Sequence, residues 1–194
     1  MSRMTPSSNL AVGALGVLTV VAALSACRDT RWINAFEALP PPGTPGPQFE
    51  APLVHADTLV SGKSLLGAPS VVALWSTTCR GSRESLARLR ELNETYKMRG
   101  VRFLILAADP SISRLSTFVD SAHVEIPMAH APDLEAFDFS DQASDTDEYR
   151  VLFALPSFLV LDSRGVVVAR SGGMLSDSVL VSALDSLTRG EGAS

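Results

Sequence analysis

The feature that most limits the fold of this chain is an uninterrupted apolar run that leads into a cysteine. The run Val71-Val72-Ala73-Leu74-Trp75 carries no charged or amide side chain, and helical periodicity begins three residues after Cys79. A short apolar run of this kind is typical of a strand that is buried on both faces. We therefore expect a strand over residues 70–76, then Cys79 at a strand-to-helix junction, then a helix over residues 82–98.

A cysteine at such a junction is well placed to act as a nucleophile. The first N–H groups of a helix have no partner within the helix, and the helix dipole favours negative charge there. Both effects stabilise a thiolate, which is the attacking form of cysteine. The spacing is Cys79-x-x-Ser82, whereas a dithiol redox site would have Cys-x-x-Cys. The site therefore has an attacking sulfur and lacks a second sulfur to resolve an adduct. We expect the Ser82 hydroxyl, with Arg80 and Arg83 nearby, to help stabilise the Cys79 thiolate.

Composition narrows the class of partner. The 194 residues are 46% hydrophobic and 19% charged, which suits one globular domain. The net charge of −5, with no cluster of Lys and Arg, argues against a nucleic-acid partner. His55, His123 and His130 lie far apart in the sequence without ligand spacing, so we expect no metal. We also expect no other cofactor. His130 is expected at the surface, with a position near Cys79 as the alternative.

The N-terminus has the features of an export signal. Arg3 precedes a charge-free run over residues 10–26, which ends in Leu24-Ser25-Ala26-Cys27 and resembles the bacterial lipobox. We expect a lipoprotein signal peptide over residues 1–26 and a lipidated Cys27. The protein is then attached to a bacterial membrane and faces the periplasm or the extracellular side; an uncleaved membrane anchor is the alternative. Disulfides persist outside the cytoplasm, and Cys79 is left there as an unpaired thiol.

Two further segments follow from composition. Residues 40–47 contain five prolines and two glycines, which predicts a stiff, extended spacer; a tolerated loop is the alternative. The lipidated cysteine and this tether are expected to occupy residues 27–48, and the globular domain residues 49–190. Residues 132–148 contain seven acidic side chains and no basic one, which predicts a solvated loop.

The rest of the chain alternates strands and helices. We expect a weak hairpin over residues 51–54 and 57–60, strands over 101–107, 124–128 and 158–161, a turn at 162–165 with a return strand over 166–170, and helices over 109–122 and 175–187. The strand–helix–strand around Cys79 predicts a right-handed βαβ unit. The fold class is α/β, with a central mixed sheet flanked by helices and an N-terminal hairpin extension.

With these strands and helices in this order, residues 49–187 resemble the thioredoxin fold. The resemblance is specifically to the membrane-anchored, TlpA-like branch of thiol–disulfide oxidoreductases. The resemblance rests on Trp75 four residues before Cys79, on the helix that starts at the site, on the segment Leu155-Pro156-Ser157-Phe158, and on the closing Asp162-x-x-Gly165 turn. It implies a cis-Pro156 packed against Cys79, with Leu155 offering backbone groups to an extended substrate. Trp75 and Thr78 are the other residues expected to contact substrate, although a tryptophan on a buried strand is most simply part of the core wall beneath the site.

The site departs from that branch in ways that bear on mechanism. Ser82 replaces the second cysteine, Gly81 stands where proline is common, and Thr78 stands where many members have a bulky residue. The branch often has a glutamate six residues after the first cysteine, where this chain has Ser85. The apolar strand before the site also lacks a buried acid, so no carboxylate that could shuttle protons is evident.

Several functions remain open. Ser82 cannot resolve a mixed disulfide, so a self-contained dithiol cycle is excluded. We favour monothiol exchange with protein thiols or disulfides of the envelope, resolved by an external thiol or a partner reductase. The alternative is a redox-silent thioredoxin-fold module that binds extended peptides, with Cys79 as a buried small residue. A one-cysteine peroxidase would have Pro-x-x-x-Thr-x-x-Cys, where this chain has Val72 and Ser76, and a copper chaperone would have a second cysteine.

Overall fold

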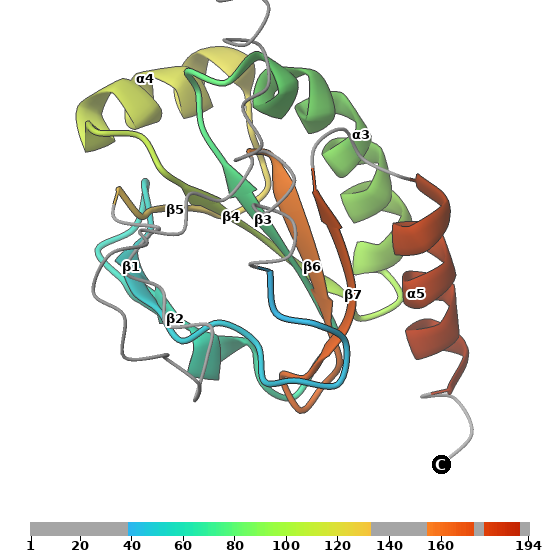
Figure 1. The fold of residues 1–194 in the computed structure, drawn as a ribbon. Coiled ribbons are helices and arrows are strands. Elements are labelled where there is room, and N and C mark those ends of the chain that lie inside the picture. The colour runs from blue at the N-terminus through green and yellow to red at the C-terminus, as the bar shows by residue number, and fades with distance from the viewer. Residues whose placement is uncertain (1–38, 133–154, 173–176, 191–194) are drawn as a thin grey trace, which may run out of the picture. The chain divides into compact units, whose positions relative to one another are not determined.

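The centre of the fold is a mixed sheet with the strand order β5-β4-β3-β6-β7 (Figure 1). The computed structural model describes residues 39–132, 155–172 and 177–190, all within one unit, Ile33–Ser194. Within these ranges β3 (Ser70–Trp75), β4 (Arg102–Ala107) and β5 (Met128–His130) are parallel, and β6 (Ser157–Leu161) and β7 (Val167–Gly172) complete the sheet by antiparallel pairing. The predicted α/β class and mixed sheet are confirmed.

Strand β3 is buried on both faces, as its apolar run predicts. Val71, Ala73 and Trp75 belong to one core cluster, whereas Val72 and Leu74 belong to the other. Successive side chains of a strand point to opposite faces, so a strand with helices on one side and other chain segments on the opposite side is apolar throughout. Its central place in the sheet fixes the position of the residues that follow it.

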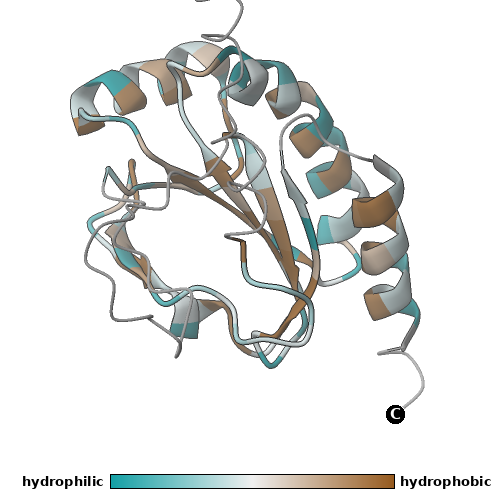
Figure 2. Ribbon diagram, viewed as in Figure 1, coloured by the Kyte–Doolittle hydropathy of each residue, from teal (hydrophilic) through white to brown (hydrophobic). Residues whose placement is uncertain are grey.

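Three helices pack into the first of these clusters. They are α3 (Arg80–Lys97), α4 (Ile112–Ala122) and α5 (Asp177–Gly190), and Figure 2 shows apolar and polar positions alternating along them. The apolar stripe predicted for the helix after Cys79 is confirmed, because the following side chains are all buried: Leu86, Leu89, Leu92 and Tyr96.

Tyr96 and Arg99, at the far end of α3, both contact Asp185 of α5. The Tyr96 hydroxyl donates to Asp185 Oδ1 at 2.9 Å, and the Arg99 guanidinium lies over the Tyr96 ring. Burial of the ring, together with the nearby Asp185 carboxylate, raises the pKa of Tyr96 above its ordinary value. Tyr96 is therefore a buried hydrogen-bonded tie at the end of α3 opposite Cys79.

The opposite face of the sheet is covered by the N-terminal extension. The predicted hairpin is confirmed as β1 (Glu50–Pro52) paired antiparallel with β2 (Leu59–Ser61), followed by the 3₁₀ turn η1 (Gly62–Leu65). The extension buries Phe49 and Leu65 against the sheet. A two-stranded hairpin is marginal by itself, so this packing is what stabilises it.

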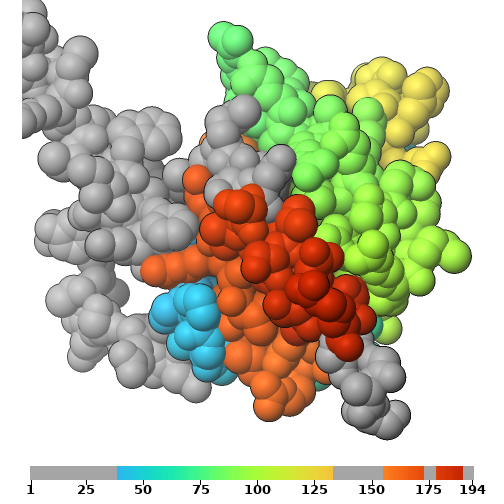
Figure 3. Space-filling model, turned by 90° about the vertical axis from the view of Figure 1, so that its right-hand side faces the viewer, coloured from blue at the N-terminus to red at the C-terminus, as the bar shows by residue number. Residues whose placement is uncertain are grey.

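The proline-rich segment is not a free spacer, and that prediction is wrong. Gly43 N–H donates to Val167 O at 2.8 Å, Val167 N–H donates to Thr44 O at 2.9 Å, and Gly46 N–H donates to Gly165 O at 2.8 Å. Leu39 is fully buried at the start of this segment. Figure 3 shows these blue residues against the orange of the β6–β7 hairpin. The globular part therefore begins upstream of the predicted residue 49, because a proline-rich chain can still pair at a sheet edge.

Some element boundaries differ from the prediction. Helix α4 starts at Ile112 rather than 109, because the Ser111 hydroxyl accepts from Arg114 N–H and caps the helix there. The following strand starts at Met128 rather than 124, after His123 ends α4 with a left-handed backbone. Apart from residue 132, the predicted acidic loop lies outside the described residues. Within the part of the chain that the structure describes, no helix is both long and apolar enough to cross a bilayer.

The predicted turn between β6 and β7 is confirmed. Gly165 has a φ of +78°, and its N–H donates to Asp162 O at 2.9 Å. Burial alone would raise the pKa of the Asp162 carboxyl, but bonds from the N–H groups of Val166 and Arg164 and from the Arg164 guanidinium outweigh it. They hold that pKa below its ordinary value. The turn thus fixes the end of the hairpin on which residues 43–46 lie.

Candidate active site

The candidate active site lies where three parallel strands end. Cys79 follows β3, Asp109 follows β4, and His130 is the last residue of β5. Because the carboxyl ends of parallel strands meet at one edge of a sheet, these residues share that edge. Open α/β sheets typically bind ligands there.

Cys79 is the N-cap residue of α3 and is half-buried. It is the free cysteine of the part of the chain that the structure describes. Its Sγ donates to Leu155 O at 3.3 Å, across a sequence separation of 76 residues. The Leu155–Pro156 peptide is cis, as the thioredoxin resemblance implied. The structure therefore brings the predicted nucleophile and the predicted proline segment together.

Gly81 allows a close approach between the first turn of α3 and Pro156. A Cβ at this position would lie 3.3 Å from Pro156 Cδ and 4.0 Å from Cys79 Sγ. Even the smallest side chain would therefore crowd the proline ring and touch the sulfur. The glycine therefore leaves room for the Pro156 ring beside the first turn of α3.

Ser82 is fully buried and belongs to the scaffold of the site. Its Oγ accepts from Ser76 N–H at 3.3 Å, and its carbonyl accepts from Trp75 Nε1–H at 2.5 Å and from the Ser85 hydroxyl at 2.7 Å. Within the described residues the Ser82 hydroxyl bonds to Ser76 and the Cys79 thiol bonds to Leu155 O, so the expected support of Cys79 by this hydroxyl is not seen. The hydroxyl at the position of a resolving cysteine instead holds the strand end in place.

The residues expected to contact substrate divide into two groups. Trp75 is fully buried and its ring centroid lies 5.3 Å from that of Phe118, so its predicted contact with substrate is wrong. Trp75 instead packs in the core beneath α3, and its indole N–H donates to Ser82 O. Thr78 is exposed beside Cys79, and the Leu155 carbonyl is occupied by the thiol. Thr78 and Leu155 remain candidates for substrate contact.

The two arginines beside Cys79 make other contacts. Arg80 Nε donates to Glu84 Oε1 at 2.6 Å on the exposed side of α3. Arg83 Nη1 donates to Thr77 O at 2.5 Å. Arg80 is therefore paired along its own helix, and Arg83 holds the loop that precedes the cysteine.

Asp109 is the residue that the sequence prediction missed. It is fully buried, its Oδ2 accepts from Thr77 N–H at 2.9 Å, and its Oδ1 accepts from the Thr77 hydroxyl. The strand before Cys79 carries no acid, as predicted, but the neighbouring strand supplies one. The signal available in the sequence was an aspartate directly after the apolar strand at residues 101–107, since parallel strands end at the same edge.

His130 lies beside Asp109 rather than at the open surface. It is half-buried, and its Nε2 lies 2.7 Å from Asp109 O. The expectation of a surface histidine is therefore wrong, because β5 pairs with β4 and places His130 opposite Ala107. Within the described residues, no group of three His, Cys, Asp or Glu side chains could hold a metal ion.

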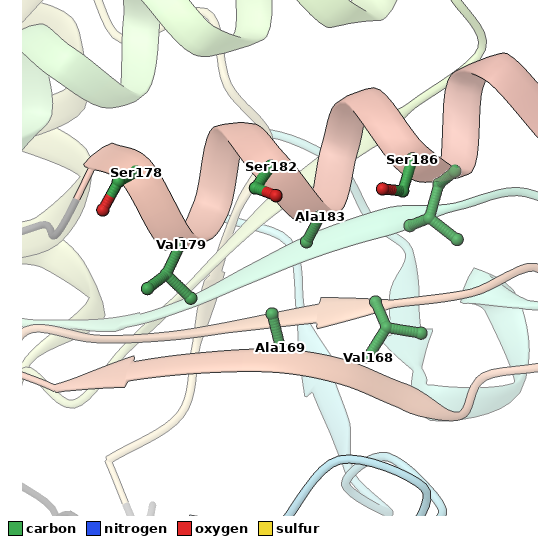
Figure 4. Close-up of a pocket in the computed structure, with 8 residues that line it drawn as sticks. Val168, Ala169, Ser178, Val179, Ser182, Ala183 and Ser186 are labelled. Atoms are coloured by element: carbon green, nitrogen blue, oxygen red, sulfur yellow. The ribbon is translucent and has the colours of Figure 1, made fainter.

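A groove of about 600 Å³ lies elsewhere, between β7 and α5. Figure 4 shows Val179 and Ala183 of α5 pointing towards Ala169 of β7, with Ser182 on the same helix. Its lining consists of aliphatic side chains and serines, and Cys79 is not part of it. The groove and the cysteine site are thus separate features of the structure.

The mixed sheet, with a half-buried cysteine at the start of a helix, is that of a thioredoxin-like protein. The AhpC/TSA family model matches residues 42–170, more than half of the chain. The chain therefore belongs to the AhpC/TSA family.

Named relatives agree with this class. The thiol:disulfide interchange protein DsbE of two strains of Xylella fastidiosa is 35% identical over 78 residues, which are 40% of this chain and 40% of the relative. The chain thus spans about two fifths of the length of the curated relatives it matches.

Solved structures share the fold. A putative DsbE from Chlorobium tepidum covers 76% of this chain and 99% of its own, with a TM-score of 0.60 at 18% identity. A secreted thiol-disulfide isomerase from Corynebacterium glutamicum covers 74% of this chain and 84% of its own, with a TM-score of 0.61 at 16% identity.

Proposed function

We propose that the protein carries out thiol–disulfide exchange by a monothiol route, as a member of the TlpA-like branch. The observation that carries the proposal is the position of Cys79, half-buried at the start of α3 and hydrogen-bonded to Leu155 beside Pro156. The family membership and the names of the relatives support the same chemistry.

The exchange has two steps. The Cys79 thiolate attacks one sulfur of a substrate disulfide, so that a Cys79–S bond forms and the substrate S–S bond breaks. The departing substrate thiolate takes a proton from solvent. An external thiolate then attacks the substrate sulfur of this mixed disulfide, forms a disulfide with it, and releases Cys79 as a thiolate. The number of disulfides is unchanged in each step.

Ser82 is the reason that the second step is intermolecular. An alkoxide is not accessible near neutral pH and cannot form a disulfide, and the Ser82 hydroxyl is buried in a bond to Ser76 N–H. The mixed disulfide on Cys79 therefore persists until an external thiol or a partner protein arrives. We propose protein thiols or disulfides, together with such a reductant, as the partners.

The test uses the full chain in a Cys27→Ser background, so that Cys79 is its single thiol. With oxidised glutathione as the probe, we expect one mixed disulfide per chain by intact mass, removed by added glutathione and absent in Cys79→Ala. The competing redox-silent module predicts that Cys79 resists the probe in the folded protein and reacts only after unfolding. That result would overturn the proposal.

The residues before Cys79 differ from those of a one-cysteine peroxidase site. Val72 and Ser76 stand where that motif has proline and threonine, and Val72 is a core residue of the sheet. The Ser76 hydroxyl lies 2.9 Å from Thr78 Oγ1 and accepts from Thr78 N–H. The Ser76 hydroxyl is thus engaged within the loop.

We also propose that residues 1–26 are a lipoprotein signal peptide, that Cys27 carries lipid, and that the domain is held at a bacterial membrane facing the periplasm or outside. Residues 1–38 lie outside the described residues, so this proposal rests on the lipobox pattern. Mass spectrometry of the mature N-terminus is expected to find a diacylated or triacylated Cys27. An unmodified N-terminus upstream of residue 27 would contradict it.

A further inference from the structure

The loop that leads to Cys79 has each of its backbone N–H groups bonded. Ser76 N–H donates to Ser82 Oγ, Thr77 N–H to Asp109, Thr78 N–H to Ser76 Oγ, and Cys79 N–H to Ser76 O, at 2.9 to 3.3 Å. Two of these bonds stay within the loop. The other two connect it to α3 and to the end of β4, so the loop is tied at separate points before any substrate binds.

Thr77 is bonded through three of its polar groups to residues outside the loop. Its N–H and its hydroxyl both donate to Asp109, and its carbonyl accepts from Arg83 Nη1 at 2.5 Å. Asp109 follows β4 and Arg83 belongs to α3. The backbone two residues before the nucleophilic sulfur is thus held between a strand end and a helix.

The hydrogen bonds of the Asp109 carboxylate connect it to the loop that precedes Cys79. Asp109 is fully buried, and every hydrogen bond that its carboxylate makes in the described part of the chain comes from Thr77. A buried carboxylate costs free energy unless hydrogen bonds compensate for its lost hydration. Its burial is thus compensated by one residue, which lies in the cysteine loop.

We propose that Asp109 is a positioning residue for Cys79. It acts through Thr77, holding the loop so that the sulfur stays against the Leu155–Pro156 segment with the geometry that exchange requires. The kinetic part of this inference rests on the proposed function, whereas the structural part does not. Reaction rates are sensitive to such placement, because a shift of about 1 Å in a reacting group can cost about 100-fold in rate.

Three substitutions separate the effect of position from that of charge. Asp109→Asn keeps an oxygen that accepts from Thr77 N–H, and its amide can donate to the Thr77 hydroxyl oxygen. Asp109→Ala removes both contacts. Thr77→Val keeps the N–H and removes only the hydroxyl. If Asp109 acts by position, Asn rescues the function that Ala loses, and Thr77→Val lies between them.

The first measurement is amide hydrogen exchange at Thr77 and Cys79, which needs no activity. We expect Asp109→Ala to accelerate exchange there by about 10-fold or more, with Asp109→Asn within about 3-fold of wild type. The second is the rate of mixed-disulfide formation with oxidised glutathione, which we expect to fall by about 10- to 100-fold in the alanine variant and by less than about 3-fold in the asparagine variant. Tyr96→Phe is the matched control, since it removes a partly buried hydroxyl-to-carboxylate bond at the other end of α3 and is expected to change neither rate.

The outcomes are distinguishable. Equal losses in the Asn and Ala variants would show that charge, not position, matters, and would overturn the inference. Unchanged amide exchange in Asp109→Ala would do the same. If the alanine variant does not fold, a Thr77→Val protein with wild-type amide exchange and rate overturns the inference, and a loss confined to the loop supports it. A wild-type protein without disulfide exchange would overturn the proposed function, while amide exchange would still test the tie.

Discussion

Ser82→Cys is expected to give Cys79 a resolving partner and so to change the protein from a monothiol into a dithiol site. Residues three apart on a helix are neighbours, and Cys79 caps the helix whose third residue is 82. An internal thiol competes with external thiols at a high effective concentration, so we expect the mixed disulfide to be released at least about 100-fold faster. The measurement is the lifetime of the glutathione adduct by intact mass after the free glutathione is removed.

The substitution also removes a hydrogen bond, and the control must account for that. A thiol is a weak acceptor, so Ser76 N–H loses much of its bond to position 82, at a cost of about 1–3 kcal/mol. Ser85→Cys is a matched control, because Ser85 is equally buried on the same helix. It lies six residues from Cys79, about 9 Å along the axis, which is too far for a disulfide.

The outcome that contradicts the prediction follows from this pair. Adduct lifetimes that match in Ser82→Cys and Ser85→Cys would mean that position 82 does not face the sulfur. The same conclusion would follow if oxidised Ser82→Cys protein kept two free thiols besides any at position 27. Either result would show that the start of α3 differs from that of a dithiol site.

The sequence predicted the elements around Cys79 well because their signals are local. The apolar run before the cysteine specifies a strand buried on both faces, and the stripe Leu86-Leu89-Leu92-Tyr96 specifies the buried face of α3. Each pattern is set by the periodicity of its own element. The turn at Asp162 and Gly165 is local in the same way. Such features need no knowledge of the register between strands.

The tie at Thr77 could not be predicted in the same way. Thr77 and Asp109 are 32 residues apart, and they meet because β3 and β4 pair with Trp75 opposite Ala107. A shift of two residues in that register would separate them. The end of an apolar strand is visible in the sequence, but the partner of a buried carboxylate depends on the register. The missing acid was therefore sought on the wrong strand.

The prediction for the proline-rich segment was wrong for a different reason, because it relied on composition and ignored a buried residue beside the segment. Proline and glycine density over residues 40–47 is typical of a spacer, yet the segment pairs with the edge of the sheet at Val167. The apolar residue before the segment explains why it is docked. Leu39 lies in the core cluster on the face of the sheet that the N-terminal extension covers. Its carbonyl also accepts from the Arg170 guanidinium.

Leu39→Ala is accordingly expected to lower the free energy of unfolding by about 2–4 kcal/mol, through lost burial and the cavity left behind. Leu59→Ala is the matched control, since Leu59 belongs to the same N-terminal extension but is 58% exposed. Its substitution is expected to cost less than about 0.5 kcal/mol. Urea unfolding of the full chain measures both. A spacer that hangs free of the domain would give small, equal losses for the two leucines, whereas a docked segment makes Leu39 one of the more costly substitutions. Because residues 43–46 bond to the β6–β7 hairpin, the loss is also expected to accelerate amide exchange at Val167.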